Sequence, residues 1–245
     1  MGWIRSALFQ AGMILSLVAF ALLAPLTLPL SFKYRYGFLT RWGAVVLWWL
    51  RVTCGVRYRV EGAEHIPHTP TVVLAKHQST WETIALQRVL PPQTWVLKRE
   101  LLRLPFFGWA LALLRPIAID RAAGRRALAQ LLEQGAERLK QGIWVIVFPE
   151  GTRTAPGTRG RYNIGGAMLA EKTGTPALPV AHNAGEFWPR NSFLKRPGVI
   201  TVVIGPPIAT AGRKAGEINA EAEAWIEETM ARISQATAVP ATAAS

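Results

Sequence analysis

The chain has 245 residues, half of them hydrophobic, and it carries a formal net charge of +13. This composition excludes wholesale disorder, because enough apolar residues are present to bury a core. The only cysteine is Cys54. An internal disulfide is therefore excluded, which agrees with a reducing compartment.

The positive charge is concentrated near the N-terminus, in a part of the chain that is also rich in apolar residues. Before Glu61 there are seven basic residues and no acidic one, whereas the rest of the chain has 21 basic and 15 acidic residues. A basic segment rich in Trp, Leu and Val favours an anionic membrane surface as its partner. No nucleic-acid motif or basic stripe is present, so we predict no nucleic-acid partner.

A long apolar run follows Arg5, and no residue from Ser6 to Phe32 is charged. Its part from Ala11 to Leu30 is long enough to cross a bilayer, for which about 20 apolar residues suffice. Pro25 and Pro29 weaken its second half as a helix. Four interpretations remain open: a cleaved signal peptide, a single membrane span, a re-entrant or in-plane helical hairpin, and a buried helix of a soluble protein.

A second apolar run, Trp42–Leu50, lies between two arginines. It is too short to span a bilayer and predicts a helix in the interface, with its tryptophans at headgroup depth. If the first run spans the membrane, the six positive charges from Lys33 to Arg59 hold the following domain in the cytoplasm. We expect residues 1–55 to anchor the chain at the cytoplasmic face of the bacterial inner membrane.

The rest of the chain alternates short apolar runs, rich in β-branched residues, with helical patterns. This alternation predicts an α/β domain with a largely parallel central sheet flanked by helices. We place this domain at 56–234 and expect the small, uncharged residues 235–245 to form a flexible tail. The expected strands are Val56–Val60, Thr71–Ala75, Thr94–Leu97, Pro116–Ile119, Ile143–Phe148, Ala177–Ala181 and Val199–Ile204. The expected helices are Ala127–Leu139, Ile164–Lys172 and Ile218–Ile233.

A histidine directly follows the second expected strand, at the end where open α/β sheets bind their ligands. The imidazole of His77 can accept a proton near neutral pH, and the carboxylate of Glu82 can fix its tautomer. The pair requires His77 to precede the first turn of the next helix. Glu82 also fits a capping box with Ser79, and His77 fits a satisfied polar residue at a strand end. The residues alone leave these alternatives open.

An arginine follows the fifth expected strand in a turn that contains a glycine. Gly151 permits the turn, and the planar guanidinium of Arg153 suits a phosphate group. Glu150 needs a partner there, either a backbone N–H or the substrate. The basic pair Lys98-Arg99 follows the third strand and adds charge at the same sheet edge. The alternative is a solvated loop with an incidental Glu–Arg pair.

A metal site is not expected. His65 and His68 are three residues apart, but no cysteine or further ligand lies near them in the sequence.

Together these stretches resemble the motif blocks of the glycerolipid acyltransferases, specifically the 1-acyl-sn-glycerol-3-phosphate acyltransferases. The first block of that family is His-x4-Asp, and this chain has His77–Glu82, in which glutamate replaces the commoner aspartate. The third block, Phe-Pro-Glu-Gly-Thr-Arg, is unbroken at Phe148–Arg153. Lys98–Leu101 with Ile119–Arg121 is similar to the second block, and Leu178–Val180 to the fourth.

The resemblance implies transfer of a fatty acyl group from acyl-CoA or acyl carrier protein to the sn-2 hydroxyl of lysophosphatidic acid, giving phosphatidic acid. No cofactor or metal is implied, because the acyl donor is itself a substrate. His77 and Glu82 would be catalytic. The implied substrate-binding residues are Lys98, Arg99, Arg121, Glu150, Gly151, Thr152 and Arg153.

Two other hypotheses compete with this one. The first is an acyltransferase for another lysolipid acceptor, such as a lyso-aminolipid. The second is a non-catalytic membrane lipid-binding protein, and intact His77 and Glu82 count against it because a binder needs no base.

Overall fold

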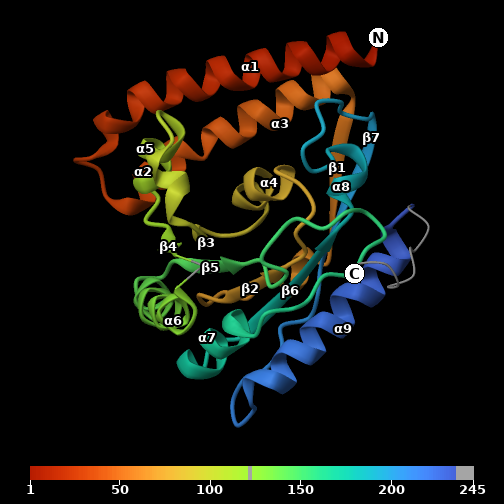
Figure 1. Cartoon of the computed structure of the whole chain (residues 1–245). Helices are drawn as coiled ribbons and strands as arrows, with labels where there is room; N and C mark the ends of the chain where they lie inside the picture. The colour runs from red at the N-terminus through yellow and green to blue at the C-terminus, as the bar shows by residue number, and fades with distance from the viewer. Residues whose placement is uncertain (121–122, 236–245) are drawn as a thin grey trace.

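A seven-stranded sheet runs through the computed structural model, which describes residues 1–120 and 123–235 (Figure 1). The strand order is β1-β7-β6-β2-β5-β3-β4. Every neighbouring pair is parallel except β6 and β7, so the predicted α/β fold with a largely parallel sheet is confirmed. The strands are β1 (Val56–Glu61), β2 (Val72–Ala75), β3 (Gln93–Lys98), β4 (Ile117–Ile119), β5 (Trp144–Val147), β6 (Ala177–His182) and β7 (Gly198–Ile204).

Helices cover both faces of the sheet, and each face has its own apolar core. Strands β2 and β5 are buried along their whole length, which explains why their sequences are continuously apolar. On one face the core includes residues of α3 and α4, and on the other it includes residues of α6, α7 and α9. The helices of the α/β domain are α4 (Trp81–Val89), α5 (Phe107–Ala112), α6 (Arg125–Lys140), α7 (Gly165–Thr173), α8 (Ala184–Phe187) and α9 (Ala215–Ile233), with two 3-10 turns, η2 (Ala63–His65) and η3 (Arg99–Arg103).

The N-terminal segment forms an antiparallel pair of helices, α1 (Gly2–Leu23) and α3 (Arg41–Cys54), which lie side by side in Figure 1. The indole N–H of Trp49 donates to the carbonyl of Leu8 at 3.0 Å, and that of Trp42 donates to the Ser16 hydroxyl at 3.2 Å. These two bonds hold Trp42 and Trp49 against α1, and the depth of Trp42, Trp48 and Trp49 in a membrane stays a prediction. Only Trp48 of the three is largely exposed, at 60 %.

The first helix ends where the prolines predicted a break. A 3-10 turn, η1 (Ala24–Thr27), follows α1, and α2 (Phe32–Leu39) leads back toward α3. The guanidinium of Arg35 donates to the carbonyls of Thr27, Leu28 and Leu30. These carbonyls lie where the helix is interrupted, and that of Thr27 also accepts the N–H of Leu30 at 3.0 Å, so Arg35 stabilises the turn between the two helices.

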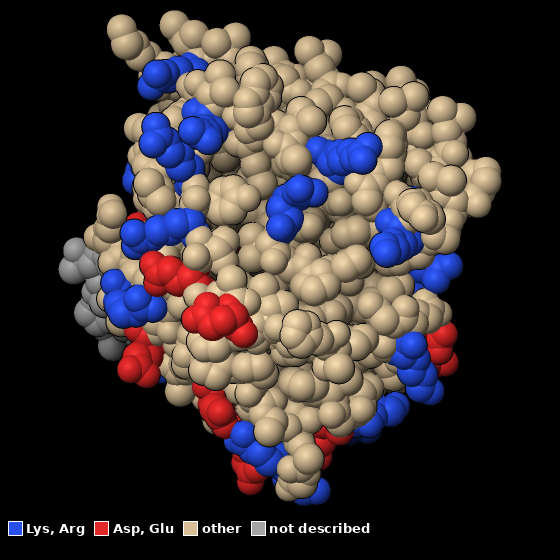
Figure 2. Space-filling view, turned by 180° about the vertical axis from the view of Figure 1, so that it is seen from behind, with Lys and Arg blue, Asp and Glu red and all other residues tan. Residues whose placement is uncertain are grey.

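α1 lies on the outside of the molecule. The stretch Gly2–Thr27 has a mean hydropathy of 2.2, is long and apolar enough to cross a membrane, and has only 17 % of its most apolar window buried. Acidic side chains are absent from the upper part of Figure 2, where the N-terminal helices lie, and gather on the lower half. Of the predicted tail, Gln235 donates its N–H to Glu186 at 2.9 Å, and residues 236–245 lie outside the described part of the chain.

Candidate active site

Three neighbouring parallel strands bring the sequence motifs to one edge of the sheet. β2 pairs with β5, and β5 pairs with β3. His77 lies just past β2, Phe148 directly follows β5, and Lys98 is the last residue of β3. The rings of His77 and Phe148 stack with their centroids 4.2 Å apart. The N–H of Thr154 donates to the carbonyl of His77 at 2.8 Å, so the two loops form one unit.

His77 and Glu82 form the predicted pair. His77 precedes α4, and its Nδ1 lies 2.8 Å from Oε1 of Glu82, the second residue of that helix. The same Oε1 accepts the N–H groups of Gln78 and Ser79 at 2.9 and 2.8 Å. Glu82 therefore has both of the roles that the sequence left open, the cap of α4 and the partner of His77. It accepts backbone N–H groups just before the helix start, and it holds the imidazole.

The surroundings keep Glu82 charged and His77 in one tautomer. Burial raises the pKa of the Glu82 carboxyl, but the attraction of His182 and His77 in their protonated forms, the His77 hydrogen bond and the Ser79 N–H outweigh it and hold the pKa below its ordinary value. A carboxylate only accepts, so His77 donates through Nδ1. Its Nε2 then carries the lone pair, and this atom has no hydrogen-bond partner within residues 1–120 and 123–235.

His182 lies behind Glu82 and is fully buried. Its Nε2 donates to the carbonyl of Lys76 at 2.8 Å, and its Nδ1 accepts the N–H of Ala184 at 3.3 Å. Burial lowers the pKa of His182, which is therefore neutral at pH 7. Its neutral ring supports the backbone next to His77 and lies 3.9 Å from the second oxygen of Glu82.

Glu150 is placed behind the site and not in contact with the space in front of His77. Its carboxylate accepts the N–H of His77 at 2.9 Å and pairs with the ammonium of Lys76 at 2.7 Å. Both side chains are sealed from solvent, and Lys76 also contacts Glu227 of α9 at 2.9 Å. Of the two partners that the sequence left open for Glu150, the backbone N–H is the one observed. The structure thus corrects our expectation of a substrate contact.

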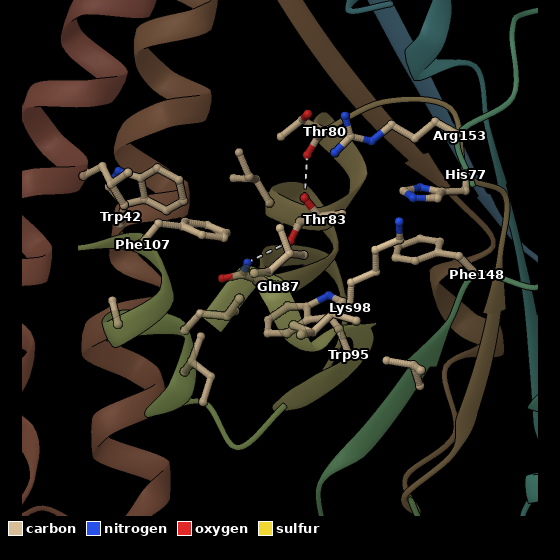
Figure 3. Close-up of a pocket in the computed structure, with 18 of the residues that line it drawn as sticks. Trp42, His77, Thr80, Thr83, Gln87, Trp95, Lys98, Phe107, Phe148 and Arg153 are labelled. Atoms are coloured by element: carbon tan, nitrogen blue, oxygen red, sulfur yellow. Dashed lines mark hydrogen bonds between the residues drawn. The ribbon is translucent and has the colours of Figure 1, made fainter. Parts of the chain in front are cut away.

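A cavity of about 480 Å³ opens in front of His77 (Figure 3). Its near end is polar and cationic: Lys98 and Arg153 lie beside the imidazole in Figure 3, and Arg190, which also lines the cavity, donates to the carbonyl of Arg153 at 3.0 Å. Its remaining wall is mostly apolar and comes from α1, α4, β3, η3 and α5, including Phe20, Trp95 and Phe107. Such a shape fits an amphipathic molecule with an anionic group near His77 and a hydrocarbon chain beyond it.

The predicted binding residues divide into those that line this cavity and those that do not. Gly151, Thr152, Arg153 and Lys98 line it. Neither the guanidinium of Arg153 nor the ammonium of Lys98 has a hydrogen-bond or ion-pair partner in the described ranges 1–120 and 123–235. Arg99 turns away from the cavity and pairs with Asp120 at 3.2 Å. Arg121 lies outside the described residues.

Three features of the site were not predicted from the sequence. Lys76 was adjacent to His77, and a lysine ending an apolar strand was the available signal of a buried charge. Arg190 follows α8 and lines the cavity, but nothing in its local sequence marks it. The apolar wall from α1 and α5 also had no local signal, because tertiary packing brings it to His77.

No three His, Cys, Asp or Glu side chains in the described part of the chain gather in a way that would hold a metal ion. Ser79 is buried and donates its hydroxyl to the carbonyl of Trp188 at 2.6 Å, so it is not placed as a nucleophile. What the site offers chemically is one oriented base beside two cations, Arg153 and Lys98, that no described side chain pairs. That combination can take a proton from an alcohol whose own anionic group is bound nearby.

An α/β domain with an oriented base in a cavity at the carboxyl edge of its sheet is typical of an enzyme, and comparison with known proteins gives the family. The family model "Acyltransferase" matches residues 57–183. A 1-acyl-sn-glycerol-3-phosphate acyltransferase of Pseudomonas aeruginosa is 50 % identical over 236 residues, covering 94 % of this chain and 92 % of the relative. The human 1-acyl-sn-glycerol-3-phosphate acyltransferase alpha is 32 % identical, over 69 % of this chain and 61 % of the relative.

The same result comes from solved structures. The crystal structure of the 1-acyl-sn-glycerophosphate (LPA) acyltransferase PlsC from Thermotoga maritima superposes with a TM-score of 0.81, at 25 % identity, over 95 % of both chains. The chain therefore belongs to the acyltransferase family and is an enzyme.

Proposed function

We propose that this enzyme transfers a fatty acyl group from a thioester of coenzyme A or acyl carrier protein to the sn-2 hydroxyl of lysophosphatidic acid, giving phosphatidic acid. One observation carries the proposal. The imidazole of His77, held at 2.8 Å by Glu82, lines the same cavity as the cations Arg153 and Lys98. The names of the relatives support the choice of acceptor.

Each group has a role in the proposed reaction. Arg153 and Lys98 bind the phosphate of the acceptor, which fixes the hydroxyl that faces His77. Nε2 of His77 takes the hydroxyl proton while the oxygen attacks the thioester carbonyl. The C–O bond forms, the C–S bond breaks, and the proton on His77 passes to the departing thiolate. Glu82 stabilises the transient imidazolium.

We also propose that α1 and α3 hold the enzyme on the cytoplasmic face of the bacterial inner membrane. Of the possibilities that the sequence left open, the in-plane hairpin fits the contacts best. α3 bonds to α1 through Trp49 and Trp42 and packs against α4 on its other side, so α1 lies along the domain. The excess of basic residues in this segment favours an anionic leaflet.

The test is a thiol-release assay with purified enzyme and a long-chain acyl-CoA, with and without lysophosphatidic acid. We expect release to depend on the acceptor and His77→Ala to lower kcat/KM by at least about 10³-fold. His68→Ala, at an exposed histidine, is the matched control. Undiminished turnover in His77→Ala would remove the base from the mechanism, and equal rates with an acceptor that lacks phosphate would exclude the proposed acceptor.

A further inference from the structure

A third apolar run lies inside the α/β domain, far from the N-terminal helices in sequence. The eleven residues from Leu104 to Leu114 contain no charged or polar side chain, and Arg103 and Arg115 bound them. A run of this length is too short to span a bilayer and is typical of a core helix, a re-entrant segment or an interfacial segment. The structure discriminates between these, because it shows which side chains are covered.

The run is apolar on two opposite faces, and only one of them is buried. Phe107, Ala110 and Leu111 line the cavity in front of His77. On the outer side Leu104 is 47 % exposed and Trp109 is 57 % exposed. A helix that is apolar all round requires an apolar environment on both sides. As a core helix, α5 would have this outer face covered, and no described residue covers it.

The helix α1, which contacts α5, also has exposed apolar side chains. α5 packs against α1 below its C-terminal half (Figure 1). That half of α1 exposes Leu15, at 71 %, and Leu22, at 64 %. The two exposed surfaces belong to neighbouring elements, although about a hundred residues separate them in sequence. A contiguous apolar surface larger than scattered single side chains marks an interaction site.

Charge indicates which partner fits. Arg103 is exposed at the start of the run and has no ion-pair partner among residues 1–120 and 123–235. An exposed tryptophan on an apolar helix with a basic flank is the composition of a segment that lies at the headgroup level of an anionic bilayer. Gly108 lets α5 lie directly on η3, since a Cβ there would be 2.4 Å from the carbonyl oxygen of Leu102, so η3 and α5 pack closely together.

We propose that residues 99–114, the η3–α5 segment, insert into the headgroup–acyl boundary of an anionic bilayer beside α1. The wall of the cavity that α1 and α5 form then faces the lipid. An acyl chain passes from the bilayer to His77 between α1 and α5 and does not cross water. This inference rests on the proposed function, because a path for an acyl chain matters only if the substrate is a lipid. Insertion itself can be measured without catalysis.

The first experiment places a fluorescent label on the outer face of α5. Cys54 is the only native cysteine, so Trp109→Cys in a Cys54→Ala background gives one labelling site on the full chain. With the environment-sensitive dye NBD and vesicles of phosphatidylglycerol and phosphatidylethanolamine, we expect a shift of emission to shorter wavelength. We also expect quenching by lipids brominated near the headgroup end of the acyl chain.

The matched control is Glu133→Cys in the same background, on the exposed side of α6 across the sheet, where neither change is expected. An unshifted and unquenched label at position 109, with the enzyme bound to the vesicles, would overturn the proposal. A shift that needs no vesicles and grows with protein concentration would also overturn it, because a second copy of the chain would then cover this face.

The second experiment tests the consequence for substrate access. Trp109→Glu puts a carboxylate on the outer face, and Ile164→Glu makes the same change at a 43 % exposed residue next to α7. We expect Trp109→Glu to lose several-fold in kcat/KM with long-chain substrates presented in vesicles. With short-chain, water-soluble donor and acceptor it should equal the wild type, and Ile164→Glu should equal it with both.

These arms separate the two proposals. If the wild type fails to acylate the soluble acceptor, the proposed function fails, while the label still reports insertion. If Trp109→Glu matches the wild type on vesicles, or loses activity equally with soluble substrates, the lipid-facing wall is wrong whatever the reaction.

Discussion

The charged groups behind His77 differ in kind from those in front of it. Behind the imidazole, Lys76, Glu82 and Glu150 are all buried, and each has partners at 2.7 to 2.9 Å. In front of it, Lys98 and Arg153 line a cavity and carry no partner in the described ranges. The first group holds the shape of the site, and the second is available to an anion from outside.

Physical chemistry explains the division. A buried charge without a partner is costly, so each charge behind the site persists beside partners that offset it. A cation at an open cavity stays hydrated until a ligand displaces the water, and leaving it unpaired costs little. Glu150 and Arg153 belong to one short motif, yet they fall on opposite sides. Gly151 between them has a φ of 68°, a turn that glycine adopts without strain.

Glu82→Gln removes the buried carboxylate that holds the base, His77, and should have the largest effect on activity. The amide can still accept the N–H groups of Gln78 and Ser79, but it no longer stabilises the imidazolium. We expect kcat to fall on the order of 10³-fold with little change in the KM of the acceptor. Steady-state kinetics check this. A variant with near-normal kcat would show that Glu82 is only a cap.

Lys76→Met disrupts the buried charges behind His77 and should lower the stability of the protein. It leaves Glu150 buried without its counter-charge, and losing one partner of a buried pair costs about 3–5 kcal/mol. Denaturant unfolding in detergent measures this. The double variant Lys76→Met/Glu150→Gln should recover part of the loss, since it removes both charges. If the single variant is as stable as the wild type, the carboxylate is not held by Lys76.

Arg153→Ala removes the main cation in front and should act on binding alone. A hydrogen bond to a charged group contributes about 1.5–3 kcal/mol, so we expect the KM of lysophosphatidic acid to rise roughly 10- to 100-fold. Stability should be unchanged. Arg159→Ala, at an exposed arginine paired with Glu223, is the control and should leave the KM as it is. A loss of folding in Arg153→Ala would show that this arginine supports the structure, as the buried charges behind His77 do.

His182, another buried group behind His77, should make the stability of the protein depend on pH. Because burial lowers its pKa, the unfolded chain binds a proton below about pH 6.5 that the folded chain does not. Its contribution to stability is therefore complete above that pH and is lost as the pH falls toward the folded pKa, at up to about 1.4 kcal/mol per pH unit. His182→Gln should flatten this slope in urea titrations between pH 6.5 and 5. His68→Gln, at an exposed site, should not, and an unchanged slope in His182→Gln would contradict the assignment.

Much of the fold could be predicted from local pattern. All seven expected strands and the three expected helices of the α/β domain are present, because β-branched runs and helical spacing report burial directly. The position of His77 and Arg153 at one sheet edge also followed, since parallel strands share their carboxyl ends. The placement of β7 between β1 and β6, parallel to β1 and antiparallel to β6, did not follow, because strand order and direction depend on distant segments.

The sequence by itself determined the elements, the catalytic edge and the apolar N-terminus, since each of these is written in neighbouring residues. Only the tertiary structure decided that Glu150 faces Lys76, that Arg190 joins the cavity, and that α1 and α5 wall it. These depend on the direction in which a side chain leaves its turn and on contacts between segments far apart in the chain. Local spacing carries no information about either, because packing against the rest of the molecule selects among several directions that the backbone allows.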